Sequence, residues 1–116
     1  MPTQNWTFKA KLIRVVDGDT IDLEIDIGLH GRRIERMRLL GINCPEMHGD
    51  ARPAGLAAKD YTSKWLESLD VDWPLVISTY KSDVFGRYLA VVWRRSDGSC
   101  LNDDLVASGN AIPFMV

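Results

Sequence analysis

The nine residues from 38 to 46 bring together side chains that can bind charge and hold water. They read Arg-Leu-Leu-Gly-Ile-Asn-Cys-Pro-Glu, so an Arg, an Asn and a Glu accompany a run of apolar residues that ends in a break. Gly41 permits backbone angles closed to other residues, and Pro45 fixes its own φ and lacks an N–H donor. We therefore expect Asn43 and Glu46 on a stiff, exposed loop at a strand end, where binding and catalytic residues are often found.

Acidic and basic residues are segregated upstream of this loop. Five carboxylates lie between residues 17 and 26, and four arginines lie between residues 32 and 38. Such an arrangement can place a cation site beside a phosphate site, because carboxylates bind hard cations and guanidinium groups bind phosphate oxygens. It is equally typical of a hairpin with solvated faces and cross-strand ion pairs, which is the interpretation we favour for most of these residues.

Hydrophobic periodicity predicts the strands that position these groups. Residues 6–16 roughly alternate between apolar and polar, and residues 20–27 alternate strictly. A turn at residues 28–31 should lead into a third strand at residues 33–42, which completes a meander. The candidate core positions on these strands are Ile21, Leu23, Ile25, Ile27, Ile34, Met37, Leu39 and Leu40.

The rest of the chain predicts two helices and two further strands. Apolar residues recur every three to four positions over residues 53–69, and Pro53 suits the first helical turn. Residues 75–80 and 88–93 are typical of strands, and a short helix should follow Asn102 as N-cap and stop at Gly109. The predicted fold is mainly β with two to three helices, built on a five-stranded barrel of the oligonucleotide-binding (OB) type. The stripe that the first helix should bury comprises Ala54, Ala58, Tyr61, Trp65 and Leu69.

Composition bounds the class of protein. At 116 residues, 46% hydrophobic and 26% charged, the chain is expected to form one domain over residues 1–116. No apolar run has the length of a membrane helix, and the N-terminus lacks the features of a signal peptide, so we expect a cytoplasmic protein without a membrane partner. Cys44 and Cys100 lack the spacing of a zinc site and are expected to be free thiols. The net charge of −2 argues against a protein that coats nucleic acid through bulk electrostatics.

Three fragments in a fixed order carry a family resemblance. They are residues 16–20 (Val-Asp-Gly-Asp-Thr), residues 38–46 and residues 83–90 (Asp-Val-Phe-Gly-Arg-Tyr-Leu-Ala). Together they resemble the staphylococcal-nuclease-like (thermonuclease) family over about residues 11–111, with a gap near the hairpin at residues 28–33. The resemblance implies a five-stranded OB-fold barrel and calcium-dependent hydrolysis of phosphodiester bonds in DNA or RNA that leaves 3′-phosphates.

The resemblance also implies a calcium (Ca²⁺) site. Asp19 matches a metal carboxylate of the family, and Asn43 stands where a second carboxylate is usual. Cys44 matches a Thr that lends its backbone carbonyl to the metal. Calcium suits such an all-oxygen shell, but the neutral Asn43 should bind it more weakly than a carboxylate.

Three further positions match the family's catalytic group. Arg38 and Arg87 match phosphate-binding arginines, and Glu46 matches the glutamate that activates or positions the attacking water. Physical chemistry supports these roles, because a phosphodiester is anionic and its hydrolysis requires positive charge at the phosphoryl oxygens and a positioned water. Arg suits the first task because its planar fork makes paired hydrogen bonds to phosphate. Candidate substrate contacts are Lys81, Phe85 and Tyr88.

A non-catalytic module that binds nucleic acid or protein is the alternative. Asn43 favours the module, as does a chain that stops at Val116 where family members often continue into a third helix. The joint presence of both arginines and Glu46 favours the enzyme, since a carboxylate does not help to bind a polyanion. Phe85 belongs to a Val-Phe pair that replaces a Lys-Tyr pair of the family, and Phe114 is a partial substitute for its stacking tyrosines. We expect a monomer.

Overall fold

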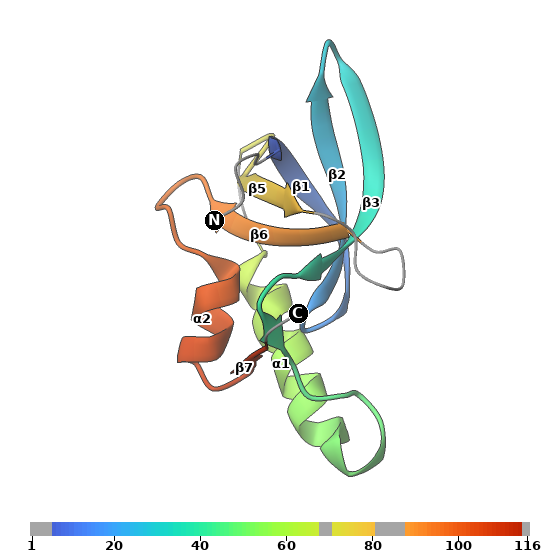
Figure 1. Ribbon diagram of the computed structural model, residues 1–116, viewed down its shortest axis with the longest axis vertical. Helices are drawn as coiled ribbons and strands as arrows, with labels where there is room; N and C mark the ends of the chain where they lie inside the picture. The colour runs from blue at the N-terminus through green and yellow to red at the C-terminus, as the bar shows by residue number, and fades with distance from the viewer. Residues whose placement is uncertain (1–5, 68–70, 81–87, 115–116) are drawn as a thin grey trace.

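A closed five-stranded barrel forms the centre of the computed structural model, which describes residues 6–67, 71–80 and 88–114 (Figure 1). Its strands are β1 (Trp6–Asp17), β2 (Thr20–Gly28), β3 (Gly31–Leu39), β5 (Leu75–Tyr80) and β6 (Tyr88–Arg94). The order around the barrel is β1-β2-β3-β6-β5, and only the β3–β6 pairing is parallel. The structure therefore confirms the predicted mainly β fold with a five-stranded barrel.

Two helices lie at one end of the barrel, and the β2–β3 hairpin projects from the other (Figure 1). A short 3₁₀ turn, η1 (Gly49–Ala51), leads into α1 (Arg52–Trp65), and α2 (Leu101–Ala107) follows β6. Pro53 occupies the first turn of α1 as predicted, but this helix ends at Trp65 and not near residue 69, which lies outside the described residues. Within the described part of the chain, neither α-helix is long and apolar enough to span a membrane.

A second, two-stranded sheet lies beside the barrel. Its strands are β4 (Ile42–Asn43) and β7 (Ile112–Pro113), with Asn43 opposite Ile112. The expectation that Asn43 lies in a loop is thus wrong, because the C-terminal segment returns to pair with it.

The core fills the barrel and the space between the barrel and α1. Its side chains include most of the predicted positions: Ile21, Leu23, Ile25, Met37, Leu39, Ala58 and Trp65 are buried, and Tyr61 packs against them. The prediction is wrong for two core positions, since Ile27 is 47% exposed and Ile34 is 65% exposed. Both lie on the projecting hairpin, which extends beyond the neighbouring strands that would cover them. Ala54 of the predicted helix stripe is also exposed, and Leu40 is half-buried.

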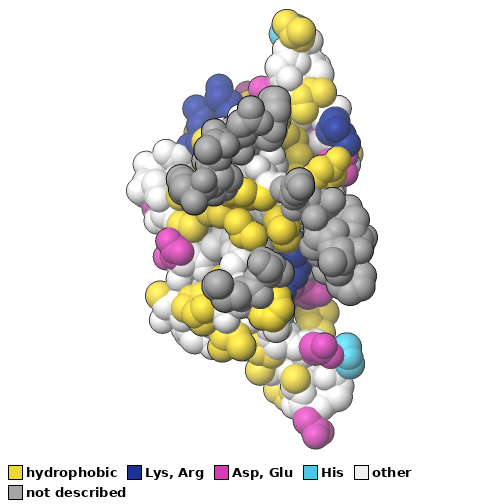
Figure 2. All heavy atoms as spheres, viewed as in Figure 1, with side chains coloured by type: hydrophobic (Ala, Val, Ile, Leu, Met, Phe, Trp, Pro, Cys, Tyr) yellow, Lys and Arg dark blue, Asp and Glu magenta, His cyan; other side chains and the backbone are white. Residues whose placement is uncertain are grey.

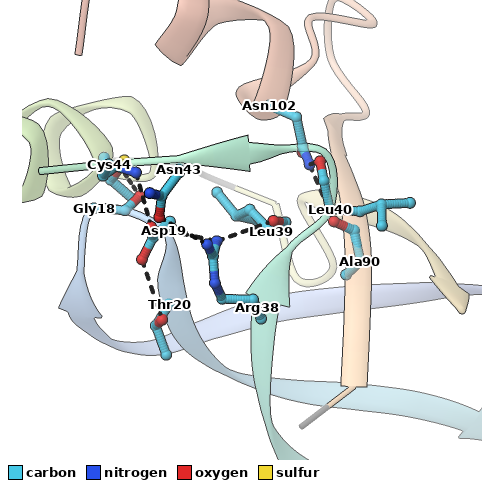
Figure 3. Close-up of polar contacts among 11 residues, drawn as sticks. Gly18, Asp19, Thr20, Arg38, Leu39, Leu40, Asn43, Cys44, Ala90 and Asn102 are labelled. Atoms are coloured by element: carbon cyan, nitrogen blue, oxygen red, sulfur yellow. Dashed lines mark hydrogen bonds and ion pairs between the residues drawn. The ribbon is translucent and has the colours of Figure 1, made fainter. Parts of the chain in front are cut away.

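Asn102 lies inside α2 and is not its N-cap, which is Cys100. The Asn102 side chain is buried, where Oδ1 accepts from Val92 N at 3.1 Å and Nδ2 donates to Leu40 O at 2.9 Å and to Ala90 O at 3.1 Å. It therefore ties α2 to β6 and to the end of β3 (Figure 3). The predicted helix stop is confirmed, since Gly109 follows the C-cap with a φ of +83° that favours glycine.

Candidate active site

Asp19 and Arg38 form the centre of the site (Figure 3). Asp19 lies in the turn between β1 and β2, and the register of β2 with β3 places Thr20 opposite Arg38. Arg38 Nη1 is 3.3 Å from Asp19 Oδ2, and their side chains are only 13% and 12% exposed. The pair is more enclosed than a surface ion pair, so it depends on neighbouring hydrogen bonds to offset the loss of water.

Those hydrogen bonds link Asp19 and Arg38 to the loop after β3. Cys44 N donates to Asp19 Oδ2 at 2.9 Å, and Thr20 Oγ1 donates to Asp19 Oδ1 at 3.3 Å. Arg38 Nη2 donates to Asn43 Oδ1 at 3.1 Å, and Arg38 Nη1 also donates to the Leu39 carbonyl at 3.2 Å. One guanidinium therefore bridges the two side chains that the sequence predicts as metal ligands.

The oxygen donors here fit a hard divalent cation. Asp17 Oδ1 is buried and has no hydrogen-bond partner, and burial together with the adjacent Asp19 raises the pKa of the Asp17 carboxyl. A cation beside these two carboxylates would satisfy the orphaned oxygen. Among the described residues no three His, Cys, Asp or Glu side chains gather to hold a metal, so Asn43 and backbone oxygens would have to complete the shell. Sequence reasoning assigned Asp17 to shaping the turn and not to binding a metal, although the Asp-Gly-Asp spacing was the available signal.

Cys44 contributes its backbone to the site and its thiol to the core. The thiol is free, as predicted, and burial raises its pKa to about 12, with the Asp19 charge adding to the effect. A Cβ at Gly18 would lie 2.9 Å from Cys44 Sγ. The thiol therefore stays protonated at neutral pH and packs tightly under the turn that bears Asp19.

Helix α1 supports both loops of the site. Thr62 Oγ1 donates to the Gly18 carbonyl at 2.7 Å, which anchors the turn before Asp19. A Cβ at Gly55 would lie 2.2 Å from the Glu46 carbonyl oxygen, a distance that no real Cβ tolerates. Gly55 thus allows the helix to contact the backbone of Glu46 directly. Sequence reasoning missed Gly55, for which the signal was a glycine inside a predicted helix.

Glu46 follows β4 in the chain, three residues after Asn43. Its side chain is 71% exposed, and Oε2 is 2.7 Å from His48 Nε2. In the described part of the chain, Glu46 is not among the hydrogen-bond partners of Arg38 or Asp19. Its carboxylate is accordingly accessible to water, with His48 as its partner.

The remaining predicted residues divide into two groups. Lys81, Phe85 and Arg87 lie outside the described residues. Tyr88 begins β6 opposite Met37, and its hydroxyl, after Glu35, helps to raise the pKa of Arg33. Arg33 and Arg38 lie on opposite faces of β3 because side chains alternate along a strand. The structure thus gathers Asp19, Arg38, Asn43 and Cys44 and places Tyr88 on the other face of β3.

An open pocket of about 160 Å³ borders the site on the side of β7. Its lining comprises Asn43, Cys44, Pro45, Gly109, Asn110, Ala111 and Ile112. Beyond it Phe114, which is 44% exposed, donates from its backbone N to the Gly41 carbonyl at 2.8 Å. This hydrogen bond holds the exposed Phe114 ring close to the turn that follows β3.

Comparisons with known proteins agree with this architecture. A family model described as staphylococcal nuclease homologue matches residues 36–115. A thermonuclease of Staphylococcus hyicus is 33% identical over 104 residues, which cover 87% of this chain and 56% of the relative. An uncharacterized endonuclease of Escherichia coli is 28% identical over 102 residues, covering 88% of this chain and 58% of the relative. An uncharacterized protein of Methanocaldococcus jannaschii is 26% identical over 125 residues, covering 90% of this chain and 58% of the relative.

The chain spans somewhat more than half the length of these curated relatives. The family match covers most of the chain, including the end of β3, the strand β4 that bears Asn43, the loop that bears Glu46, and both helices. The chain belongs to the staphylococcal nuclease homologue family.

Proposed function

We propose that this chain hydrolyses phosphodiester bonds in DNA or RNA, in a calcium-dependent reaction that leaves 3′-phosphates. The observation that carries the proposal is the enclosed Arg38, held by Asp19 and Asn43 beside the loop that bears Glu46. Two of the relatives are a thermonuclease and an uncharacterized endonuclease, which supports the same reaction class.

Arg38 would stabilise the negative charge that develops on the phosphoryl oxygens. Its guanidinium is fixed by contacts of 3.1 to 3.3 Å to Asp19, Leu39 and Asn43. A charge held in place before the substrate arrives needs little reorganisation during the reaction, which is how preorganised groups lower a barrier. Arg87, which the family resemblance assigns to the same task, lies outside the described residues.

Glu46 would position the attacking water and accept its proton. Its largely exposed carboxylate has access to solvent, and His48 is the partner it would have to release. Helix α1 holds the Glu46 backbone through the close approach at Gly55. This contact fixes the backbone from which the carboxylate reaches toward the substrate, and positioning of this kind supports general-base catalysis.

Asp19, Asn43 and the backbone carbonyl of Cys44 would hold the calcium ion, with Asp17 adjacent. A divalent cation held by these residues would supply positive charge to stabilise the phosphoryl group. The orphaned Asp17 Oδ1 and the oxygen-only donor set support this assignment. The neutral Asn43 lowers the charge of the site and therefore its expected affinity for calcium.

A non-catalytic binding module is the second candidate, favoured by the engagement of Asn43 Oδ1 with Arg38. Labelled single-stranded DNA, duplex DNA and RNA should be incubated with the chain in calcium and in chelator. We expect cleavage only with calcium, and products that a polymerase extends only after phosphatase has removed the 3′-phosphate. Folded protein that binds these substrates in calcium without cutting any of them would establish the module instead.

A further inference from the structure

Alternate residues of β3 form a line on the outer surface of the barrel, and this line begins at Arg38. Met37 and Leu39 point into the core, so the even-numbered side chains point outward. The outward residues are Arg32, Ile34, Arg36 and Arg38, opposite Asp26, Glu24, Asp22 and Thr20 of β2. Since a strand advances about 7 Å per two residues, Arg36 and Arg32 lie about 7 and about 20 Å along β3 from Arg38.

Cations outnumber and cover the carboxylates on this surface. Two carboxylates, Asp22 and Glu24, are paired with four cations at 2.8 to 3.8 Å. The cationic side chains are 38% to 64% exposed, whereas both carboxylates are only 16% exposed. With Asp26, which stands opposite Arg32, the surface holds three carboxylates against these four cations, so the face that solvent meets is positive despite the ion pairs. We call it the cationic track; its members are Lys11, Arg14, Arg32 and Arg36.

Two apolar side chains accompany the track. The Trp73 ring centroid lies 5.0 Å from Lys11 Nζ and 5.4 Å from the guanidinium carbon of Arg32, which holds these cations in place through cation–π attraction. Ile34 lies between Arg32 and Arg36 and is 65% exposed. Figure 2 shows yellow apolar side chains along the projecting hairpin, with dark blue and magenta side chains next to each other beside them.

We propose that the cationic track binds the backbone of a single nucleic-acid strand on one side of the phosphate held at Arg38. This rests on the proposed function for the position of the reacting phosphate. The spacing of outward side chains on β3 is close to the separation of successive phosphates in an extended single strand, and Arg forks suit phosphate oxygens. Exposed Ile34 and the Trp73 ring offer apolar contact to bases that are not paired, as single-strand-binding barrels do.

Binding without turnover tests the track directly. A fluorescein-labelled oligothymidylate of fifteen residues is titrated in chelator, and anisotropy is followed at several salt concentrations. The Arg32→Gln/Arg36→Gln double variant should lose affinity by about tenfold at low salt, and its log–log salt slope should decrease by about 1.4, the value for two single-strand phosphate contacts. Arg33→Gln is the matched control, because Arg33 is 54% exposed and paired with Glu35 on the opposite face of the same strand.

A second variant must act in the opposite direction. Asp22→Asn removes the carboxylate that faces Arg14 and Arg36, so it should strengthen binding about twofold to fivefold, which no loss of structure would do. Equal losses in the double variant and in Arg33→Gln would overturn the proposal, because they would indicate bulk charge alone. Tighter binding of a fifteen-base-pair duplex with the same dependence on the track would overturn the single-strand assignment.

The two proposals fail in different ways. A chain that binds the oligothymidylate through the track but cuts nothing in calcium refutes the proposed function alone. A chain that cuts, but whose Arg32→Gln/Arg36→Gln variant binds like the parent, refutes the track alone.

Discussion

Arg38 Nη2 donates to Asn43 Oδ1 at 3.1 Å, so the proposed phosphate-binding residue also holds a proposed metal ligand. One amide oxygen cannot serve a guanidinium and a cation equally well. A substitution at position 43 that keeps the shape and adds charge therefore tests the metal assignment most directly.

Asn43→Asp should bind calcium at least about tenfold more tightly, which requires only about 1.4 kcal/mol. The new charge attracts the ion, while repulsion from Asp19 and stronger pairing with Arg38 offset part of the gain. Calorimetric titration of calcium into both forms measures the difference. Asn110→Asp is the control, since Asn110 lines the same pocket but bonds to Ser108. Equal or weaker affinity in Asn43→Asp would exclude Asn43 as a ligand.

Arg38→Ala, Glu46→Ala and Arg87→Ala should each lower nuclease turnover by at least about a hundredfold, the usual effect of losing a positioned charge or base. The free energy of unfolding should distinguish Arg38→Ala from Glu46→Ala. Arg38→Ala leaves the enclosed Asp19 uncompensated and should cost about 1–3 kcal/mol of unfolding free energy, whereas Glu46→Ala, at an exposed side chain, should change it by less than about 0.5 kcal/mol.

Urea denaturation and steady-state turnover measure these effects. His48→Ala is the control for Glu46, because it removes the imidazole that contacts Glu46 and leaves the carboxylate. Turnover that survives Glu46→Ala would remove this residue from the mechanism.

Gly55→Ala should destabilise the chain by about 1–3 kcal/mol, the usual cost of forcing extra atoms into a packed contact. Ala normally stabilises a helix interior by about 1 kcal/mol relative to Gly. The sign of the change in unfolding free energy therefore shows whether the close contact outweighs helix propensity. The displaced Glu46 backbone should also lower turnover. Ala57→Gly, at an exposed position of α1, reports the helix propensity alone. A Gly55→Ala variant more stable than the parent would show that the helix does not need this close approach.

The ion pair of Asp22 predicts a pH dependence of stability. The hydrogen bond from Arg36, helped by the nearby positive charges, lowers the pKa of Asp22 from its ordinary value of about 3.8. A lowered pKa stabilises the fold above pH 3.8, and this contribution is lost as the pH falls through the folded-state value. Asp22→Asn should therefore melt a few degrees below the parent at pH 7, and the difference should shrink as the pH falls below 3.8. A difference in melting temperature that stays constant from neutral to acidic pH would contradict the assignment.

Local patterns predicted the barrel because the strict alternation of apolar and polar residues in β2 indicates which side chains share a face of the sheet. They did not state whether another element covers that face, which is why Ile27 and Ile34 are exposed on the hairpin. Asn102 shows the same limit: an Asn before two aspartates resembles an N-cap, but contacts with β6 and Leu40, far away in sequence, place it inside α2.

The site was predictable to the same extent. The family resemblance of three short motifs predicted that Asp19, Arg38 and Asn43 belong to one site, and the structure brings these side chains together. The orphaned oxygen of Asp17 and the need for glycine at position 55 arise from contacts between separate elements, which no single motif contains. For the same reason the strand pairing of Asn43 with Ile112 could not be anticipated.

The attachment of both site loops to α1 has a consequence for local unfolding. If α1 undocks while the strand ladders persist, the Gly18 turn and the Glu46 loop lose their support in one event. The Cys44 amide, which donates to Asp19, should then exchange its hydrogen at the rate at which α1 opens, faster than the amides between β2 and β3. Activity would accordingly fail as a unit at temperatures below the melting of the barrel itself.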